Sequence, residues 1–229
     1  MIGFKLIDEG EKPPPTYKEI ICHIIFDINM EDFRRKARYV AGGHETVAPP
    51  TLAYASFVSL ESVRIDLTLA ALNDLEVKTS GIQNSYLTAP CSEKIWTTLG
   101  SKFGPDLAGK KAFVVRALYG IKSSGSSFKN HLAECKRNLG HSSCLADPYL
   151  LFKEETRPSD GAKYYAYFLL YVDDCLVINH DADKALHEID HFFKIQSGSI
   201  GDTNMYLGAK IRKVVLENGV EAWATSVLK

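Results

Sequence analysis

Two apolar segments flank the residues Val172-Asp173-Asp174, and this arrangement constrains the fold more than any other feature. Residues 164–171 and 175–178 are rich in aromatic and β-branched side chains, a composition typical of strands. Because so few residues separate the two segments, we expect them to pair as an antiparallel hairpin. The sequence therefore predicts a hairpin with two adjacent carboxylates at its tip.

Adjacent carboxylates have a specific chemical use. Two close carboxylates resist joint ionisation unless a cation neutralises them, and Mg²⁺ prefers oxygen ligands. Two such ions about 4 Å apart can clamp the attacking and leaving oxygens of a phosphoryl transfer. An ordinary acidic turn is the alternative, since Asp is common in turns, and the pair Asp173-Asp174 alone does not exclude it.

The remaining patterns predict a mixed α+β chain. Ser59 is a suitable N-cap for a helix to about Asp74, and apolar side chains lie nearly all round it, so we expect it to be buried. Asp66 is a discordant charge within it. Asn218-Gly219 predicts a hairpin turn between 206–216 and 220–225. Further elements are expected as strands over 20–28, 35–41 and 112–118, a short strand or strand-to-helix turn over 82–87, and helices after Gly125 and Asp181.

Composition narrows the class of protein. The chain has 229 residues, of which 45% are hydrophobic and 24% charged, so it can bury a core. No apolar run approaches the roughly 20 residues that a membrane helix needs. The five cysteines form no CxxC pair, which argues against a structural zinc site or a disulfide framework and favours a reducing compartment.

The formal net charge is only −1, yet the charges are segregated along the chain. Residues 110–137 contain seven basic side chains and one acidic side chain, Glu134. Such segregation predicts either a basic face on a neutral protein or an ordinary solvated surface, and charge alone does not decide between them.

Several segments resemble, in order, the reverse transcriptases of copia-type LTR retrotransposons. Tyr171-Val172-Asp173-Asp174 is similar to the catalytic hairpin of that family. The other similar segments are 20–23 with 33–43, 76–90, 116–128, Ala146-Asp147-Pro148 and Tyr206-Leu207-Gly208. The resemblance implies an α+β fold, with a reverse-transcriptase-like palm (an antiparallel sheet backed by helices) and a small fingers subdomain. Residues 17–229 would form fingers and palm, with the start of a thumb at most, after a linker over 1–16.

The resemblance also implies roles at the hairpin. Asp173 would be the principal ligand of Mg²⁺ or Mn²⁺, with Asp174 supporting it. The family carries a further metal-binding aspartate five residues before an aromatic gate, but Gly81 stands five residues before Tyr86. Glycine has no ligating side chain, and Glu76 would lie about 16 Å away along an extended strand. We therefore expect weak metal binding and impaired polymerisation.

Five further positions take roles from the resemblance. Arg38 would contact the triphosphate of the incoming nucleotide, and Tyr86 would exclude a ribose 2′-hydroxyl. Gly120 would let the backbone approach the template and nucleotide, and Lys122 would face a phosphate, as would Lys129. The alternatives are a surface arginine, a core tyrosine, a strand-end glycine and solvated lysines.

Three functions remain open from the sequence. The first is an RNA-directed DNA polymerase, impaired in this copy, that uses an RNA or DNA primer–template and dNTPs. The second is a non-catalytic nucleic-acid-binding remnant of a retrotransposon polyprotein, and the third is a folded relic without a ligand. We expect no membrane association and an intracellular location, in the cytoplasm, a virus-like particle or the nucleus. The lack of a recognisable RNase H or integrase region predicts a fragment or a degenerate copy, for which other polyprotein regions are expected partners.

Overall fold

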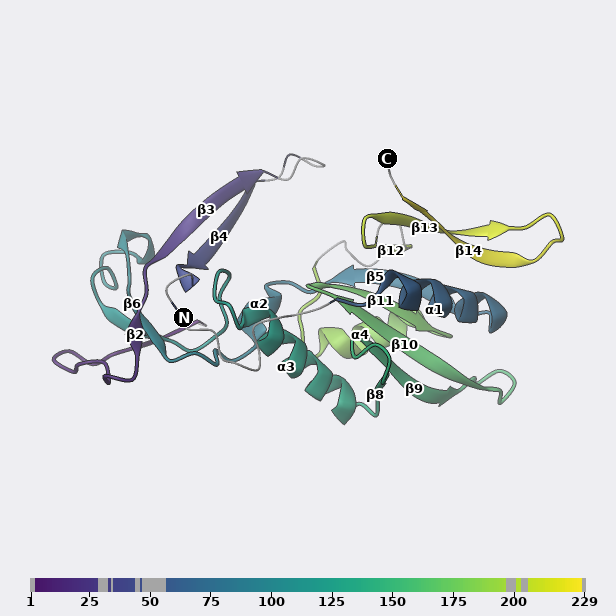
Figure 1. The fold of residues 1–229 in the computed structure, drawn as a ribbon, viewed down its shortest axis with the longest axis horizontal. Helices are drawn as coiled ribbons and strands as arrows, with labels where there is room; N and C mark the ends of the chain where they lie inside the picture. Colours follow the sequence, from purple (N-terminus) through teal and green to yellow (C-terminus); the bar gives the residue numbers. More distant parts are fainter. Residues whose placement is uncertain are drawn as a thin grey trace. The chain divides into compact units, whose positions relative to one another are not determined.

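The structure is a computed structural model that describes residues 3–28, 33, 35–43, 46, 57–196, 201–202 and 206–227. The chain divides into two compact units, each assembled from two separate stretches of sequence (Figure 1). Unit 1 comprises Met1–Ala55 and Asn84–His131, and unit 2 comprises Ser56–Gln83 and Leu132–Lys229.

Unit 1 contains two small sheets. The first has the strand order β1 (Phe4–Leu6), β7 (Lys111–Val114), β6 (Ile95–Thr98) and β2 (Lys18–Glu19). The second pairs β3 (Cys22–Ile28) with β4 (Arg35–Ala41) in antiparallel register, so the two strands predicted in these segments are confirmed. Short helices lie at α2 (Ser85–Thr88) and η2 (Ser101–Phe103).

The prediction of a linker over residues 1–16 is wrong at Phe4–Leu6. These residues form β1, which pairs with β7 in antiparallel register. The ring of Phe4 packs edge-on against Tyr39 and Phe103, with centroids 5.8 and 5.5 Å apart. Two aromatic contacts and a strand partner from distant sequence therefore order this segment. The strand predicted over 112–118 is shorter than expected, because β7 ends at Val114.

Unit 2 is built on a six-stranded antiparallel sheet with helices packed on it. The strand order is β12 (Gly201–Asp202), β5 (Glu76–Gly81), β11 (Asp174–Asn179), β10 (Lys163–Tyr171), β9 (Leu150–Thr156) and β8 (Ser142–Ser143). The helices are α1 (Leu60–Leu72), α4 (Ala182–Asp190) and the second half of α3 (Ser124–Asn138), which begins in unit 1. A separate hairpin, β13 (Ala209–Val215) with β14 (Glu221–Val227), surrounds the predicted turn at Asn218-Gly219.

The core of unit 2 follows the alternation of the strands. Leu176 and Ile178 of β11 pack with Val63, Leu67 and other residues of α1 on one face of the sheet. Figure 1 shows α4 against the other face, where Leu186 and Ile189 are buried. The α+β class, with an antiparallel sheet backed by helices, is therefore confirmed.

Helix α1 begins as predicted but is less buried than expected. Ser59 accepts a hydrogen bond from the Ser62 N–H and caps the helix. Ile65 is 60% exposed and Leu72 is 76% exposed, so the prediction of burial all round is wrong. The helix packs against both the sheet and β14, and Ile65 and Leu72 lie on the apolar stripe that stays exposed.

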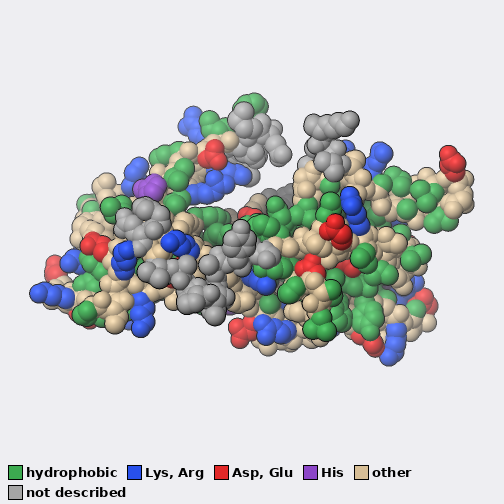
Figure 2. Space-filling view, viewed as in Figure 1, with side chains coloured by type: hydrophobic (Ala, Val, Ile, Leu, Met, Phe, Trp, Pro, Cys, Tyr) green, Lys and Arg blue, Asp and Glu red, His purple; other side chains and the backbone are tan. Residues whose placement is uncertain are grey.

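The charges divide between the units. Unit 1 carries 14 Lys and Arg against 10 Asp and Glu, whereas unit 2 carries 13 against 18. Figure 2 shows the basic side chains on the face drawn mostly as separate groups among acidic, polar and apolar ones. The segregation seen in the sequence is therefore a difference between units.

Two further findings concern the length of the helices and the state of the cysteines. Among the described residues, no helix combines the length and the apolar character that a bilayer crossing requires. All five cysteines lie in the described part of the chain, and each is a free thiol.

Candidate active site

The acidic hairpin of unit 2 has a tight tip. Tyr171 of β10 pairs with Asp174 of β11, so Val172 and Asp173 alone form the loop. Val172 has φ of 55°. A β-branched residue in this region of the backbone map is strained by about 1–3 kcal/mol, and such strain persists only where surrounding structure enforces it. The paired strands thus hold the two carboxylates at a fixed, strained tip.

Gly81 lies directly beside this tip. It ends β5 and pairs with Asp174, the first residue of β11. The next residue, Ile82, donates its N–H to the Asp173 carbonyl at 2.7 Å. A side chain at position 81 would therefore stand next to the hairpin, where the sequence predicts a missing metal ligand.

The space in front of Gly81 is already lined by polar atoms. A Cβ at position 81 would lie 3.3 Å from Oδ1 of Asp174. It would also lie 3.1 Å from both Cδ and Nε2 of Gln196. The position is therefore a small polar cradle between a carboxylate and an amide, and the hairpin offers oxygen donors that suit a divalent cation.

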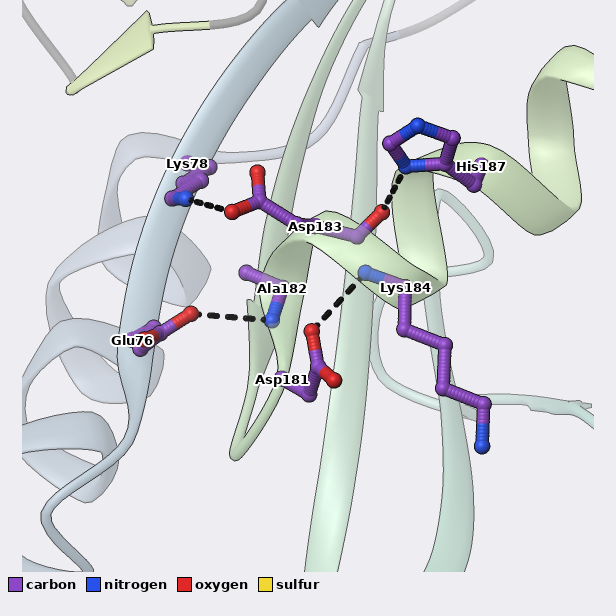
Figure 3. A network of polar contacts seen from close by, with 7 residues as sticks. All are labelled: Glu76, Lys78, Asp181, Ala182, Asp183, Lys184 and His187. Atoms are coloured by element: carbon purple, nitrogen blue, oxygen red, sulfur yellow. Dashed lines mark hydrogen bonds and ion pairs between the residues drawn. The ribbon is translucent and has the colours of Figure 1, made fainter.

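Neither Glu76 nor Asp74 supplies the missing carboxylate. Glu76 pairs with Asn179 at the far end of β5, and its Oε2 accepts the Ala182 N–H at 3.1 Å. Figure 3 shows Glu76 at the start of α4, with the ion pair of Lys78 and Asp183 beside it. Asp74 precedes Glu76 and is therefore farther from Gly81 along the chain. Its Oδ1 is 3.8 Å from Lys213 Nζ.

The donor set therefore differs from that of a three-carboxylate site. Within the described residues, no group of three or more His, Cys, Asp or Glu side chains is arranged to hold a metal. Asp173 is half-buried and Asp174 is exposed, so both carboxylates can reach solvent.

Aromatic side chains pack against Tyr171, the last residue of β10 before the hairpin tip. The Tyr171 ring contacts Phe57 and Tyr206, with centroids 4.7 and 6.4 Å away. The Tyr206 hydroxyl donates to the Leu169 carbonyl at 3.0 Å, and burial raises the pKa of this phenol well above its usual value. Burial likewise raises the pKa of the Cys175 thiol to about 12, so this residue beside Asp174 stays neutral. The side chains of Tyr206, which packs against Tyr171, and of Cys175, which follows Asp174, are therefore uncharged.

Asp147, in another of the similar segments, has a structural task. Its carboxylate accepts hydrogen bonds from the Ser59 N–H, the Ser62 hydroxyl and the Tyr149 N–H, at 2.8, 2.7 and 3.1 Å. Burial would raise its pKa, but these hydrogen bonds outweigh burial and hold the pKa below its usual value. Asp147 therefore ties the start of α1 to the turn before β9.

Unit 1 holds the other five predicted residues, of which Lys129 lies on α3. Arg38 lies on β4 opposite Ile25, and its guanidinium is 3.3 Å from the carboxylate of Asp27. Both side chains are partly exposed, so this ion pair is weak and leaves Arg38 accessible to other anions. Lys122 is exposed and donates to the Thr46 carbonyl at 2.7 Å.

Gly120 and Tyr86 lie at the end of β4. Gly120 has φ of +90°, and a Cβ there would lie 2.1 Å from the Ala41 carbonyl oxygen. The fold itself thus requires glycine at this position. The Tyr86 ring packs against the Tyr119 ring in a tilted arrangement, with centroids 4.8 Å apart, and Tyr119 bridges to Val40 of β4. The structure brings Tyr86, Gly120 and β4 together within unit 1.

Gln196 is the residue that the sequence did not indicate. It follows α4 and carries no motif or periodicity, yet its amide lines the cradle at Gly81. No local pattern predicts it, because only the pairing of distant segments brings it there.

The chain is similar to two individual known proteins. The chain is 25% identical over 222 residues to the retrovirus-related Pol polyprotein from transposon TNT 1-94 of Nicotiana tabacum. That match covers 91% of this chain and 16% of the relative's length. A foamy viral protease-reverse transcriptase, solved in complex with double-stranded DNA, aligns with a TM-score of 0.45 and 14% identity, over 82% of this chain and 31% of that one.

The family assignment rests on nearly the whole chain. Residues 10–224 match the family described as reverse transcriptase (RNA-dependent DNA polymerase). The relationship to retrotransposon enzymes that the motifs predicted is thereby confirmed. The chain belongs to the reverse transcriptase family.

Proposed function

We propose that this chain is the fingers and palm region of an RNA-directed DNA polymerase whose catalysis is impaired by Gly81. The observation that carries the proposal is the pairing of Gly81 with Asp174, which places a residue without a side chain beside the acidic hairpin. The substrates would be dNTPs and an RNA or DNA primer–template. As a transposon polyprotein region it would act inside the cell, alongside other parts of that polyprotein.

The hairpin carboxylates would hold the divalent cation. Asp173 and Asp174 supply two anionic oxygen donors, and a bound Mg²⁺ or Mn²⁺ would neutralise charge on the phosphates of the nucleotide. Without a carboxylate at position 81, the site has one negative charge fewer than the three-carboxylate arrangement. We therefore propose weak cation binding as the cause of the impairment.

The residues of unit 1 would serve the nucleotide and the template. Arg38 is partly exposed on β4 and suits a bidentate contact with a phosphate. Tyr86 is held by its packing against Tyr119, as a rigid gate against a 2′-hydroxyl requires. Gly120 and Lys122 would approach the template and a phosphate.

The direct test is primer extension with Mg²⁺ or Mn²⁺ on a primed template. We expect little dNTP incorporation by the wild type and more by Gly81→Asp. Because a Cβ at position 81 would stand 3.1 Å from Gln196, Gly81→Asp should also be tested together with Gln196→Ala. Gly81→Asn is the matched control, since it adds the same bulk without the charge.

The outcomes separate the explanations. A gain that Gly81→Asp shows and Gly81→Asn lacks supports the proposal. Equal behaviour of the Asp and Asn variants, or no gain in a folded Gly81→Asp protein with or without Gln196→Ala, would contradict it.

A second candidate function is nucleic-acid binding without catalysis. The excess of basic over acidic residues in unit 1 favours it, since phosphate contacts dominate such binding. Affinity for a primer–template should then fall steeply as salt is raised from 50 to about 200 mM. Affinity that ignores salt, or no binding at all, would leave the chain a folded relic.

A further inference from the structure

Gln196 belongs to a segment that extends the sheet beside Gly81. Its N–H donates to the Gly81 carbonyl at 2.9 Å, and the Gln83 N–H donates to the Lys194 carbonyl at 2.8 Å. Between these two hydrogen bonds, Ile195 pairs with Ile82 in an antiparallel bridge. The backbone of residues 194–196 is therefore fixed along one side of the chain at Gly81, while β11 lies along the other side.

The register puts three residues in one row. By the Ile82–Ile195 bridge Gln196 stands opposite Gly81 on one side, and Asp174 pairs with Gly81 on the other. Residues directly opposite one another in antiparallel strands project from the same face of the sheet. Gln196 and Asp174 therefore flank the one member of the row that has no side chain.

The distances show how the gap is filled. The point where a Cβ of residue 81 would stand is 3.1 Å from the Gln196 amide and 3.3 Å from the Asp174 carboxylate. An amide carries a carbonyl oxygen, and a half-turn about its last side-chain bond exchanges nitrogen for oxygen at one position. Side-chain amide oxygens bind hard divalent cations, although without the charge of a carboxylate.

We propose that Gln196 provides the third oxygen ligand of the divalent cation site, in place of the side chain missing at Gly81. This assignment rests on the proposed function, because it takes Asp173 and Asp174 as the other two ligands. It gives the hairpin two charged donors and one neutral donor. The site would thus retain cation binding in a weakened form.

The test uses Mn²⁺ alone as the probe, titrated into the full 229-residue chain and followed by electron paramagnetic resonance of the free ion. Gln196→Ala removes the amide and should weaken Mn²⁺ binding severalfold. Gln196→Glu keeps the length of the side chain and adds a charge, so it should tighten binding about tenfold or more. The control is Asn218→Asp, which adds the same charge at an exposed turn of unit 2 and should leave the affinity unchanged.

Each result decides the matter. Weaker binding by Gln196→Ala and tighter binding by Gln196→Glu support the proposal. Unchanged or tighter binding by Gln196→Ala, a Gln196→Glu affinity no higher than that of Asn218→Asp, or no Mn²⁺ binding by any variant would overturn it. Thermal unfolding of each variant establishes that it is folded, and Gln196→Glu keeps the test open if Gln196→Ala is not.

The readout also separates this proposal from the proposed function. Mn²⁺ binding requires neither primer–template nor dNTP. A chain whose Gln196 variants behave as expected, but in which Gly81→Asp adds no polymerisation, would contradict the proposed function and leave the Gln196 ligand in place.

Discussion

Asp66 offers a quantitative test of the structure. It is 1% exposed within α1, and its Oδ2 has no hydrogen-bond partner. Burial, and secondly the charge of Asp147, raise the pKa of this carboxyl from 3.8 to about 7. The folded protein therefore binds a proton at Asp66 more tightly than the unfolded chain does.

The sign of the effect follows from that difference. The contribution of protonated Asp66 to stability is complete below pH 3.8, falls as pH rises to about 7, and is constant at its lowest value above that. A change in pKa from 3.8 to about 7 corresponds to on the order of 4 kcal/mol. Local relaxation and water penetration reduce this figure, so we expect about 2–4 kcal/mol in practice.

The change to make is Asp66→Asn, which keeps the shape and removes the charge. Urea unfolding between pH 4 and 8 should show wild-type stability declining with pH relative to the variant, which should be more stable by about 2–4 kcal/mol at pH 8. Asp106→Asn, at an exposed position in unit 1, is the control and should leave the pH profile unchanged. Parallel profiles for wild type and Asp66→Asn, or a variant that is less stable at pH 8, would refute the reasoning.

Two further predictions concern packing and hydrogen bonding. Gly120→Ala should lower the free energy of unfolding by more than about 3 kcal/mol or prevent folding, because its Cβ would meet the Ala41 carbonyl oxygen at 2.1 Å. Gly109 has a similar φ of +82° but open space around it, so Gly109→Ala should lower the free energy of unfolding by only about 1 kcal/mol. Thermal unfolding of the two variants separates the effect of the close contact from that of backbone strain. Asp147→Ala removes three hydrogen bonds to a carboxylate of lowered pKa, so it should destabilise the protein by about 2–4 kcal/mol at pH 7. That loss should shrink as pH falls through the folded-state pKa of Asp147, opposite in direction to the effect at Asp66, and a loss independent of pH in urea unfolding would count against it.

The elements that the sequence predicted well are those with strong local signals. The hairpin of β10 and β11 follows from two apolar segments around a short tip, and α1 and α4 follow from caps at Ser59 and Asp181. The strands that were missed, such as β1 and β6, are only three and four residues long. Their stability comes from partners far away in the chain, which a local pattern does not reveal.

The candidate site likewise contains residues that the sequence indicated and residues that it did not. The resemblance to the family's motif led to Gly81, five residues before Tyr86, and the register of β5 with β11 places it opposite Asp174. Gln196 stayed hidden because a glutamine after a helix has no distinctive signature. The extent of burial on α1 was also misjudged, since an apolar residue such as Ile65 indicates a helix face without saying whether anything covers it.

On the proposed function, the cradle at Gly81 limits how a carboxylate could be introduced there. A single base change can turn a glycine codon into an aspartate codon, so the missing residue is genetically close. The room for it is not, because the Gln196 amide stands 3.1 Å from where the new Cβ must go. A three-carboxylate arrangement then requires two substitutions, and their order matters. If Gln196 is shortened first, the site loses its neutral oxygen donor. If Gly81→Asp comes first, the new side chain crowds the Gln196 amide. On the proposed function, restoring the third carboxylate therefore depends on the residue at position 196 as well as on the residue at position 81.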